Sequence, residues 1–299
     1  MTLDEILNTA DNRLTLIVGN GVNRYANAGN TNSWRDLLLD MARRHLPEHA
    51  HDFPTGISTT EFFDVLSLQA KSSNADSSLQ KEFCKPIRGW LSFDHHRRIV
   101  DWARHNNSPI LTTNFDTALS QACGAILQHV TTEGFTDFYP WSTYYGHGPL
   151  PRPSEGFGVW HMNGMAQYHR SVRLGLTHYM GSVQRVRDWM HRGGTSRLFS
   201  SERAIDTWRG RSTWLDAVFR NDLAIVGLAL DEVEVFIRWL LIERARLYIK
   251  FPSLKRKAWY IDTNDHTATG KGIFLSGVGV TPIMESNYDG IYAASGWKV

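Results

Sequence analysis

The chain has 299 residues, of which 42% are hydrophobic and 21% are charged, and its formal net charge at pH 7 is +2. This composition is typical of a globular protein with a large core, and the net charge by itself does not indicate a nucleic-acid partner. Its two cysteines, Cys84 and Cys123, exclude a four-thiolate zinc site and do not suggest a disulfide scaffold. The N-terminal residues are acidic and lack a long apolar core, and no apolar run reaches the ~18 residues of a membrane span, so we expect a cytoplasmic protein.

Helices and strands alternate along the chain. A short helix at residues 3–9 precedes a strand at 14–18, which is apolar on both faces and therefore expected to be buried. Further apolar strands are predicted at 109–114, 157–164, 222–230 and 257–262, and the chain closes with the segment 277–283 and short pieces of undecided structure. Helices are predicted at 34–45, 61–71, 78–91, 94–105, 115–124, 177–194 and 231–248, with more helix within 197–220 and with loops and short strands at 128–158. Ser33 is the expected cap of the helix that begins at Trp34, with Asp36 three positions on.

This alternation predicts an α/β fold with a Rossmann-like, doubly wound parallel sheet. We expect residues 1–299 to form one domain, with helical insertions at about 33–107 and 178–220. From Arg170 to Arg211 the chain has nine arginines and three acidic residues. That stretch is interpreted either as a solvated helical face or as a lid that meets phosphate groups.

Small or polar residues occur at the ends of three of the predicted strands. They are Gly19, Asn20 and Gly21 at the end of the first strand, Thr112, Thr113 and Asn114 at the end of the second, and Gly227 near the end of a later one. Doubly wound sheets bind ligands beyond the carboxyl ends of their strands, so these turns are expected to converge on one crevice where glycines admit a phosphate to the backbone. The G-x-G alone is weak evidence, because it lacks the third glycine of the dinucleotide fingerprint and no helix is predicted directly after it. A tight turn that needs positive φ is the alternative.

Four stretches, "IVGNGVN", "ILTTNFDTAL", "VWHMNG" and "IVGLALDEVEVFIRWLL", together resemble the sirtuin-like domains of bacterial antiphage-defence proteins. The resemblance covers about residues 14–247. It implies an NAD-binding domain, and several such domains hydrolyse NAD to nicotinamide and ADP-ribose.

The resemblance also implies roles for individual residues. The first phosphate-binding turn matches Gly19, Asn20, Gly21 and Val22, with Asn23 where many sirtuins have serine. Asn114, preceded by Thr113, matches the asparagine at the nicotinamide ribose, and Asp116 matches the acid associated with the nicotinamide amide. Gly227 and Leu228 match a loop near the adenosine half, and Asp231 is expected to open the helix behind it. Taken alone, Asn114 is equally explained as a helix cap and Asp116 as a first-turn acid.

The catalytic histidine is where the sequence departs from the family. The family usually has His-Gly after this strand, often within W-H-x-H-G, whereas this chain has Trp160-His161-Met162-Asn163-Gly164. Asn163 holds the usual histidine position, and His161, two residues earlier, would share its face on a strand. We therefore expect either His161 to serve as the base with Asn114 as its catalytic partner, or His161 to be an ordinary buried histidine and Asn163 to hold the working position.

The predicted function is an NAD glycohydrolase that depletes NAD during phage infection, with NAD as substrate and no metal. Zinc-dependent deacylation is disfavoured because the four-cysteine module is missing. The alternatives are a catalytically weak sensor of NAD or ADP-ribose that regulates a partner, and the abortive-infection family whose members begin "IIGNGFD". A homo-oligomer and a partner such as a ring-forming ATPase are expected; a membrane or nucleic-acid partner is not indicated.

Overall fold

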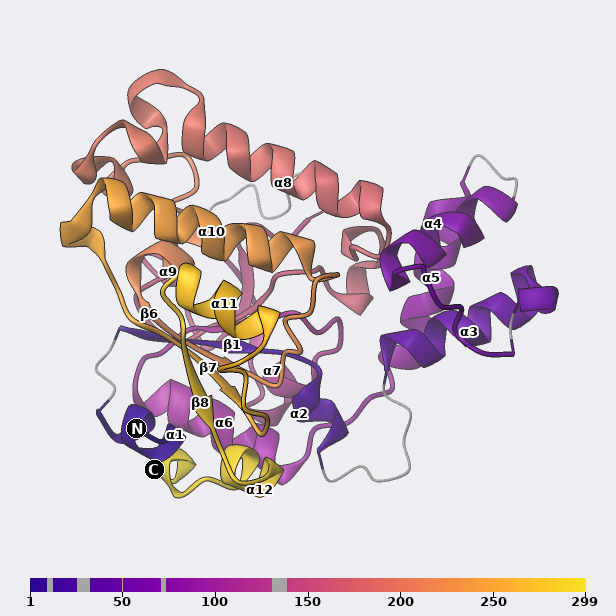
Figure 1. The fold of residues 1–299 in the computed structure, drawn as a ribbon, viewed down its shortest axis with the longest axis horizontal. Helices are drawn as coiled ribbons and strands as arrows, with labels where there is room; N and C mark the ends of the chain where they lie inside the picture. The colour runs from indigo at the N-terminus through magenta and orange to yellow at the C-terminus, as the bar shows by residue number, and fades with distance from the viewer. Residues whose placement is uncertain (10–12, 26–32, 50, 71–73, 131–138) are drawn as a thin grey trace.

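The computed structural model describes residues 1–9, 13–25, 33–49, 51–70, 74–130 and 139–299. These residues form a mixed α/β fold, an eight-stranded sheet with helices on both faces (Figure 1). The strand order is β3-β4-β5-β2-β1-β6-β7-β8. The six strands from β5 to β8 are parallel, and β4 and β3 extend the β5 edge in antiparallel pairing. The chain builds outward from β1 first through β2 and β5 and then through β6, β7 and β8, which confirms the predicted doubly wound sheet.

The strands are β1 (Leu14–Val18), β2 (Ile110–Thr112), β3 (Ile126–His129), β4 (Thr143–Gly146), β5 (Val159–His161), β6 (Asp222–Val226), β7 (Ala258–Asp262) and β8 (Thr281–Met284). The helices are α1 (Leu3–Thr9), α2 (Gly21–Arg24), α3 (Trp34–His45), α4 (Thr59–Gln69), α5 (Ala75–Ile87), α6 (Asp94–His105), α7 (Ala118–Ala122), α8 (Leu176–His191), α9 (Leu215–Arg220), α10 (Val235–Lys250), α11 (Gly270–Gly277) and α12 (Tyr288–Tyr292). Short 3₁₀ turns join several of them, and within the described ranges no helix is long and apolar enough to cross a membrane.

The two faces of the sheet bury separate cores. Alternate residues of β1 point to opposite sides: Ile17 packs with α8, α9 and α10, and Leu16 packs with α1, α6 and the C-terminal Trp297. All five residues of β1 are buried, as its apolar sequence predicts. Figure 1 shows α8 and α10 along one face, and α1, α6 and α12 along the other.

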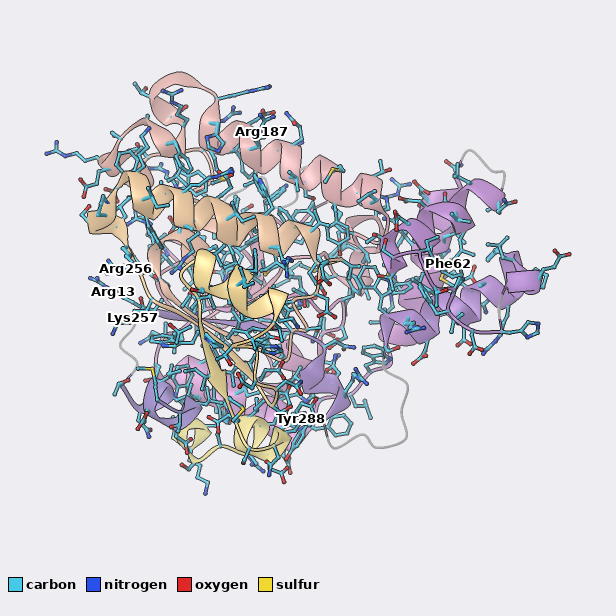
Figure 2. All side chains as sticks on the ribbon, viewed as in Figure 1. Arg13, Phe62, Arg187, Arg256, Lys257 and Tyr288 are labelled. Carbon is cyan, nitrogen blue, oxygen red and sulfur yellow. The ribbon has the colours of Figure 1, made fainter. Side chains whose placement is uncertain are left out.

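A lobe of three helices, α3 to α5, projects beside the sheet (Figure 1). It has its own core, which includes Phe62, labelled in Figure 2, and Phe83. Phe115, just beyond β2, belongs to the same core and so ties the lobe to the strand ends. Ser33 caps α3 as expected, its Oγ accepting from the backbone N–H of Asp36 at 3.1 Å. Helix α6 falls within the predicted insertion at 33–107, but it packs under the sheet rather than in the lobe.

Several predicted elements differ from those observed. A short helix, α2, does begin at Gly21, and α10 begins at Val235, so Asp231 lies four residues before the helix it was expected to open. Half of residues 197–212 forms two 3₁₀ turns, Leu198–Ser200 and Glu202–Asp206, in place of the expected helix. Helices α11 and α12, which were not predicted, occupy the last 30 residues. Of the loops and strands expected at 128–158, residues 131–138 lie outside the described part, as does Lys71 of the predicted helix 61–71.

The glycines after β1 are required by close packing of backbone. A Cβ on Gly19 would lie 2.5 Å from the carbonyl oxygen of Gly227, and one on Gly21 would lie 2.8 Å from the Cα of Gly227. Neither Gly19 nor Gly21 has positive φ, so the alternative of a turn strained at these glycines is wrong, although Gly227 itself has φ +66°. The loops after β1 and β6 therefore touch with no space for a side chain.

Replacing Gly19 by alanine is expected to destabilise the fold, because a methyl group would press on backbone atoms that cannot rotate away. Overpacking of this kind costs about 1–3 kcal/mol, measurable by denaturant unfolding. Gly181→Ala, in the exposed middle of α8 with nothing near its Cβ, is the matched control and should stabilise the protein by about 0.5–1 kcal/mol. Equal stability of wild type and Gly19→Ala would show that the two loops are not in tight contact.

Candidate functional site

A cavity of about 470 Å³ opens at the carboxyl ends of the parallel strands. Its wall includes residues that follow β1, β2, β5, β6 and β7, and side chains of the helical lobe close part of its rim. This volume is within the range of small-molecule sites. Nine of the residues predicted from the sequence line it: Asn20, Gly21, Thr113, Asn114, Asp116, Asn163, Gly227, Leu228 and Asp231.

Four of the predicted residues do not line the cavity. Gly19, Val22 and Asn23 lie behind its wall, and His161 is buried within β5 with 1% of its surface exposed. Gly19, Asn23 and His161 each hydrogen-bond a residue that lines the cavity. The fold therefore brings the predicted residues together in two layers: nine residues line the cavity, and four lie behind them.

Asn114 presents a polar atom that the fold leaves unsatisfied. Its Nδ2 donates to the carbonyl oxygen of Gly19 at 3.3 Å, which fixes the orientation of the amide. Its Oδ1 is buried and has no hydrogen-bond partner among the described residues. The alternative that Asn114 caps α7 is wrong, because neither amide atom contacts the start of that helix. A buried amide oxygen without a partner costs free energy, and Asn114 lines the cavity, so a ligand hydroxyl is the donor that this position suits.

Asp116 lies behind Asn114 in a buried polar network. Its Oδ1 accepts from the backbone N–H of Ala118 at 2.9 Å, and its Oδ2 accepts from Asn23 Nδ2 at 2.7 Å. Burial raises the pKa of Asp116 above its usual value, and the hydrogen bonds from Ala118 and Asn23 oppose that effect. The Asp116 carboxylate thus accepts a hydrogen bond at the start of α7, which agrees with the alternative that it is an acid at the beginning of this helix. It also lines the cavity.

Two histidines of α6 hold Asn23 and the turn after β1. The backbone N–H of Phe93 donates to His96 Nδ1 at 3.0 Å, so the ring proton is on Nε2, which donates to Asn23 Oδ1 at 3.0 Å. His95 Nε2 donates to the carbonyl oxygen of Val22 at 2.7 Å. Burial, with a smaller effect of the neighbouring His95, lowers the pKa of His96 to about 3, so this ring is neutral at physiological pH. Asn23 therefore links α2 to α6 and to Asp116 through its side-chain hydrogen bonds.

His161 is oriented by the backbone beside the cavity. Its Nδ1 donates to the carbonyl oxygen of Asn114 at 3.0 Å, so Nε2 carries the lone pair. Nε2 is buried and unpartnered within the described part of the chain, and burial lowers the pKa of His161 to about 4. Asn163 instead lines the cavity and donates through Nδ2 to the carbonyl oxygen of Thr113 at 3.2 Å. In this geometry His161 holds the backbone of Asn114, and of the two residues only Asn163 lines the cavity.

The backbone N–H groups of the turn after β1 are already used within the fold. Gly19 and Gly21 donate to the carbonyl oxygens of Val226 and Gly227 at 2.9 and 2.8 Å. The expectation that these glycines lay bare N–H groups for a phosphate is therefore replaced by a packing role. A positive charge is supplied instead by Arg24, an exposed side chain at the cavity that has no ion pair in the described ranges.

Sequence reasoning missed the wall contributed by the C-terminal quarter. Asp262, at the end of β7, accepts from His266 Nε2 at 2.7 Å and from the N–H of Thr263 at 2.7 Å. Lys271 of α11 pairs with Asp231 at 2.9 Å, and Glu234 lies at the start of α10. The signal that was available is the position of Asp262 after an apolar strand, the same cue that identified Asn114. No group of three His, Cys, Asp or Glu side chains able to hold a metal occurs in the part of the chain that is described.

The depressed pKa of His96 predicts acid sensitivity of the fold. Below pH 6.5 this histidine is protonated in the unfolded chain, whereas in the folded chain it stays neutral down to about pH 3. The free energy of unfolding therefore falls as the pH is lowered. At about 1.4 kcal/mol per pH unit, wild type should lose about 2 kcal/mol more than His96→Gln between pH 7 and pH 5. Urea unfolding at the two pH values measures this difference, and identical losses in the two proteins would refute it.

Comparisons with known proteins find weak similarity to solved structures alone. No family model matches the sequence, and no curated protein matches it. A solved structure described as "Structural Basis for the Mechanism and Regulation of Sir2 Enzymes" aligns with 98% of this chain and 93% of that chain, at 10% sequence identity and a TM-score of 0.43. A similarity at this level carries no argument about activity, and the architecture given above rests on the strand order of the protein itself.

Proposed function

We propose that the cavity binds NAD and that the protein hydrolyses it to nicotinamide and ADP-ribose. In this reaction water attacks C1′ of the nicotinamide ribose, the C1′–N bond breaks with its electron pair leaving on nicotinamide, and one proton is released. The observation that carries the proposal is the buried Oδ1 of Asn114, fixed at the cavity wall and lacking a donor among the described residues.

The chemistry of this reaction suits a neutral amide at that place. Breaking the glycosidic bond builds positive charge on the ribose ring, and an amide oxygen accepts a hydrogen bond from a ribose hydroxyl or an attacking water without itself becoming a competing nucleophile. Because Nδ2 is engaged with Gly19, the oxygen is preorganised for that role and pays little entropy when a ligand binds. Asn163 and Asp116, on the same wall, add polar groups for the nicotinamide end.

The remainder of the cavity suits an extended dinucleotide. Arg24 supplies a cation for the pyrophosphate, and Asp262 supplies an acceptor for hydroxyl groups at the far end, beyond β7. Between them the loop at Gly227 and Leu228 forms the floor. A role in antiphage defence by NAD depletion, an oligomeric state and a defence partner follow from the sequence resemblance alone and form part of this proposal.

A second candidate function is a sensor that binds NAD or ADP-ribose without cutting it. The position of His161 favours this candidate, because a histidine enclosed in β5 with a low pKa cannot accept a proton from water in the cavity without a rearrangement. Incubating the purified protein with NAD, with and without the products of neighbouring genes, separates the two. Nicotinamide release supports the enzyme, and binding without any release in either condition supports the sensor.

Substitution of Asn114 distinguishes a catalytic role from a binding role. Asn114→Ala should lower kcat for nicotinamide release by about 10²–10³, the usual effect of removing one preorganised group from a transition state. NAD affinity should fall less than about tenfold, because one neutral hydrogen bond contributes ~0.5–1.5 kcal/mol and the other contacts remain. Calorimetry and product analysis measure the two effects.

The matched control is Asn106→Ala, which removes an amide at the C-terminal end of α6, shortly before β2 begins and outside the cavity lining. It should retain wild-type kcat and affinity. A variant Asn114→Ala that still hydrolyses NAD at the wild-type rate would contradict the proposed site.

A further inference from the structure

Glu234 is a carboxyl group of the cavity wall that none of the roles above uses. It lies at the end of the loop after β6, where its residue forms the N-cap of α10, and it lines the same cavity as Asn114 and Asn163. Its side chain is half-buried and has no hydrogen bond or ion pair in the described part of the chain. A carboxylate at this position can therefore interact with water or with a ligand that enters the cavity.

The charges around Glu234 are few and do not neutralise it. Asp231, three residues earlier in the same loop, is negative and acts on it, although Lys271 of α11 pairs with Asp231 at 2.9 Å. Tyr179 of α8 is the titratable group that faces it from the opposite side, and its hydroxyl is buried. Arg238, four residues later in α10, donates to the carbonyl oxygen of Leu230 at 3.0 Å. Arg173 acts on Tyr179 and lies over the ring of Tyr139.

This environment sets the protonation of Glu234. Burial, with a smaller effect from Asp231, raises the pKa of Glu234 to about 7, while the pKa of Tyr179 is raised well above its usual value by burial, so that its hydroxyl stays protonated. A general base works best when its pKa is close to the working pH. Among the cavity's polar side chains, Asn114 and Asn163 are amides and poor proton acceptors, and Asp116 has both oxygens engaged by Ala118 and Asn23.

We propose that Glu234 is the general base of the hydrolysis, the role that the sequence suggested for His161. This inference rests on the proposed function. As the oxygen of water bonds to C1′ and the C1′–N bond breaks toward nicotinamide, one water proton passes to a Glu234 carboxylate oxygen. The carboxyl group then returns that proton to solvent. His161, enclosed in β5, serves as a positioning residue for the Asn114 backbone.

The test is the pH dependence of nicotinamide release from NAD between pH 5.5 and 8.5. Wild-type kcat should rise about tenfold per pH unit and level off near pH 7, because only the carboxylate form accepts the proton. Glu234→Gln should lose this rise and lower kcat by about 10²–10⁴ with little change in KM. Asp231→Asn removes the neighbouring negative charge, so the rise should move to lower pH. The control Glu232→Gln, an exposed neighbour outside the cavity, should match wild type in rate and profile.

Failure of this inference differs from failure of the proposed function. If wild type hydrolyses NAD and Glu234→Gln keeps the same rise at the same pH with kcat within about tenfold, Glu234 is not the base. If the wild-type protein binds NAD in calorimetry but releases no nicotinamide, the hydrolysis itself is refuted, and the role of Glu234 with it. Calorimetry on Glu234→Gln shows whether the variant still folds and binds NAD, so that a lost rate is attributable to the missing carboxylate.

Discussion

The contact between the loops after β1 and β6 is the constraint on which the site depends. The backbone at Gly19 and Gly21 touches the backbone at Gly227 so closely that a single Cβ on either of the first two would overlap it. This contact closes the floor of the cavity and brings the ends of β1 and β6 to one point. The N–H groups of Gly19 and Gly21 donate to carbonyl oxygens of Val226 and Gly227 within this contact, so these glycines are required for packing and not for binding a ligand through those groups.

Around that floor the protein places an inner layer of polar side chains and an outer layer that orients them. Asn114, Asp116 and Asn163 line the cavity. Behind them, Asn23 donates to Asp116 at 2.7 Å and His161 donates to the backbone carbonyl of Asn114 at 3.0 Å. Precise positioning of a site usually requires such a supporting layer. Asn23 and His161 belong to the outer layer: His96 donates to Asn23, and His161 is enclosed in β5.

The sequence was sufficient to predict the sheet and most of the inner layer, since both depend on local patterns. Short apolar strands that end near Gly or Asn place those residues at the carboxyl ends of a parallel sheet, and Asn114 and Gly227 line the cavity there. The packing of Gly19 against Gly227 could not be predicted, because it joins residues about 200 positions apart that share no pattern. Glu234 and Asp262 were missed for a related reason: their importance comes from burial and from neighbours on other elements, which the residue type alone does not reveal. Asp231 was placed in the wrong element because the acidic stretch before Val235 looks like a first helical turn but forms a loop.

In the proposed complex, Asn114 Oδ1 accepts a hydrogen bond from a ribose hydroxyl of NAD. The most direct test of this contact is a crystal structure of the protein with ADP-ribose, the product that the proposed reaction leaves in the cavity. We expect ADP-ribose to lie across the ends of β1, β2, β6 and β7, with a hydroxyl of its terminal ribose within hydrogen-bonding distance of Asn114 Oδ1. ADP-ribose bound with that oxygen still unpartnered, or a cavity left empty at saturating ADP-ribose, would rule out this role for Asn114.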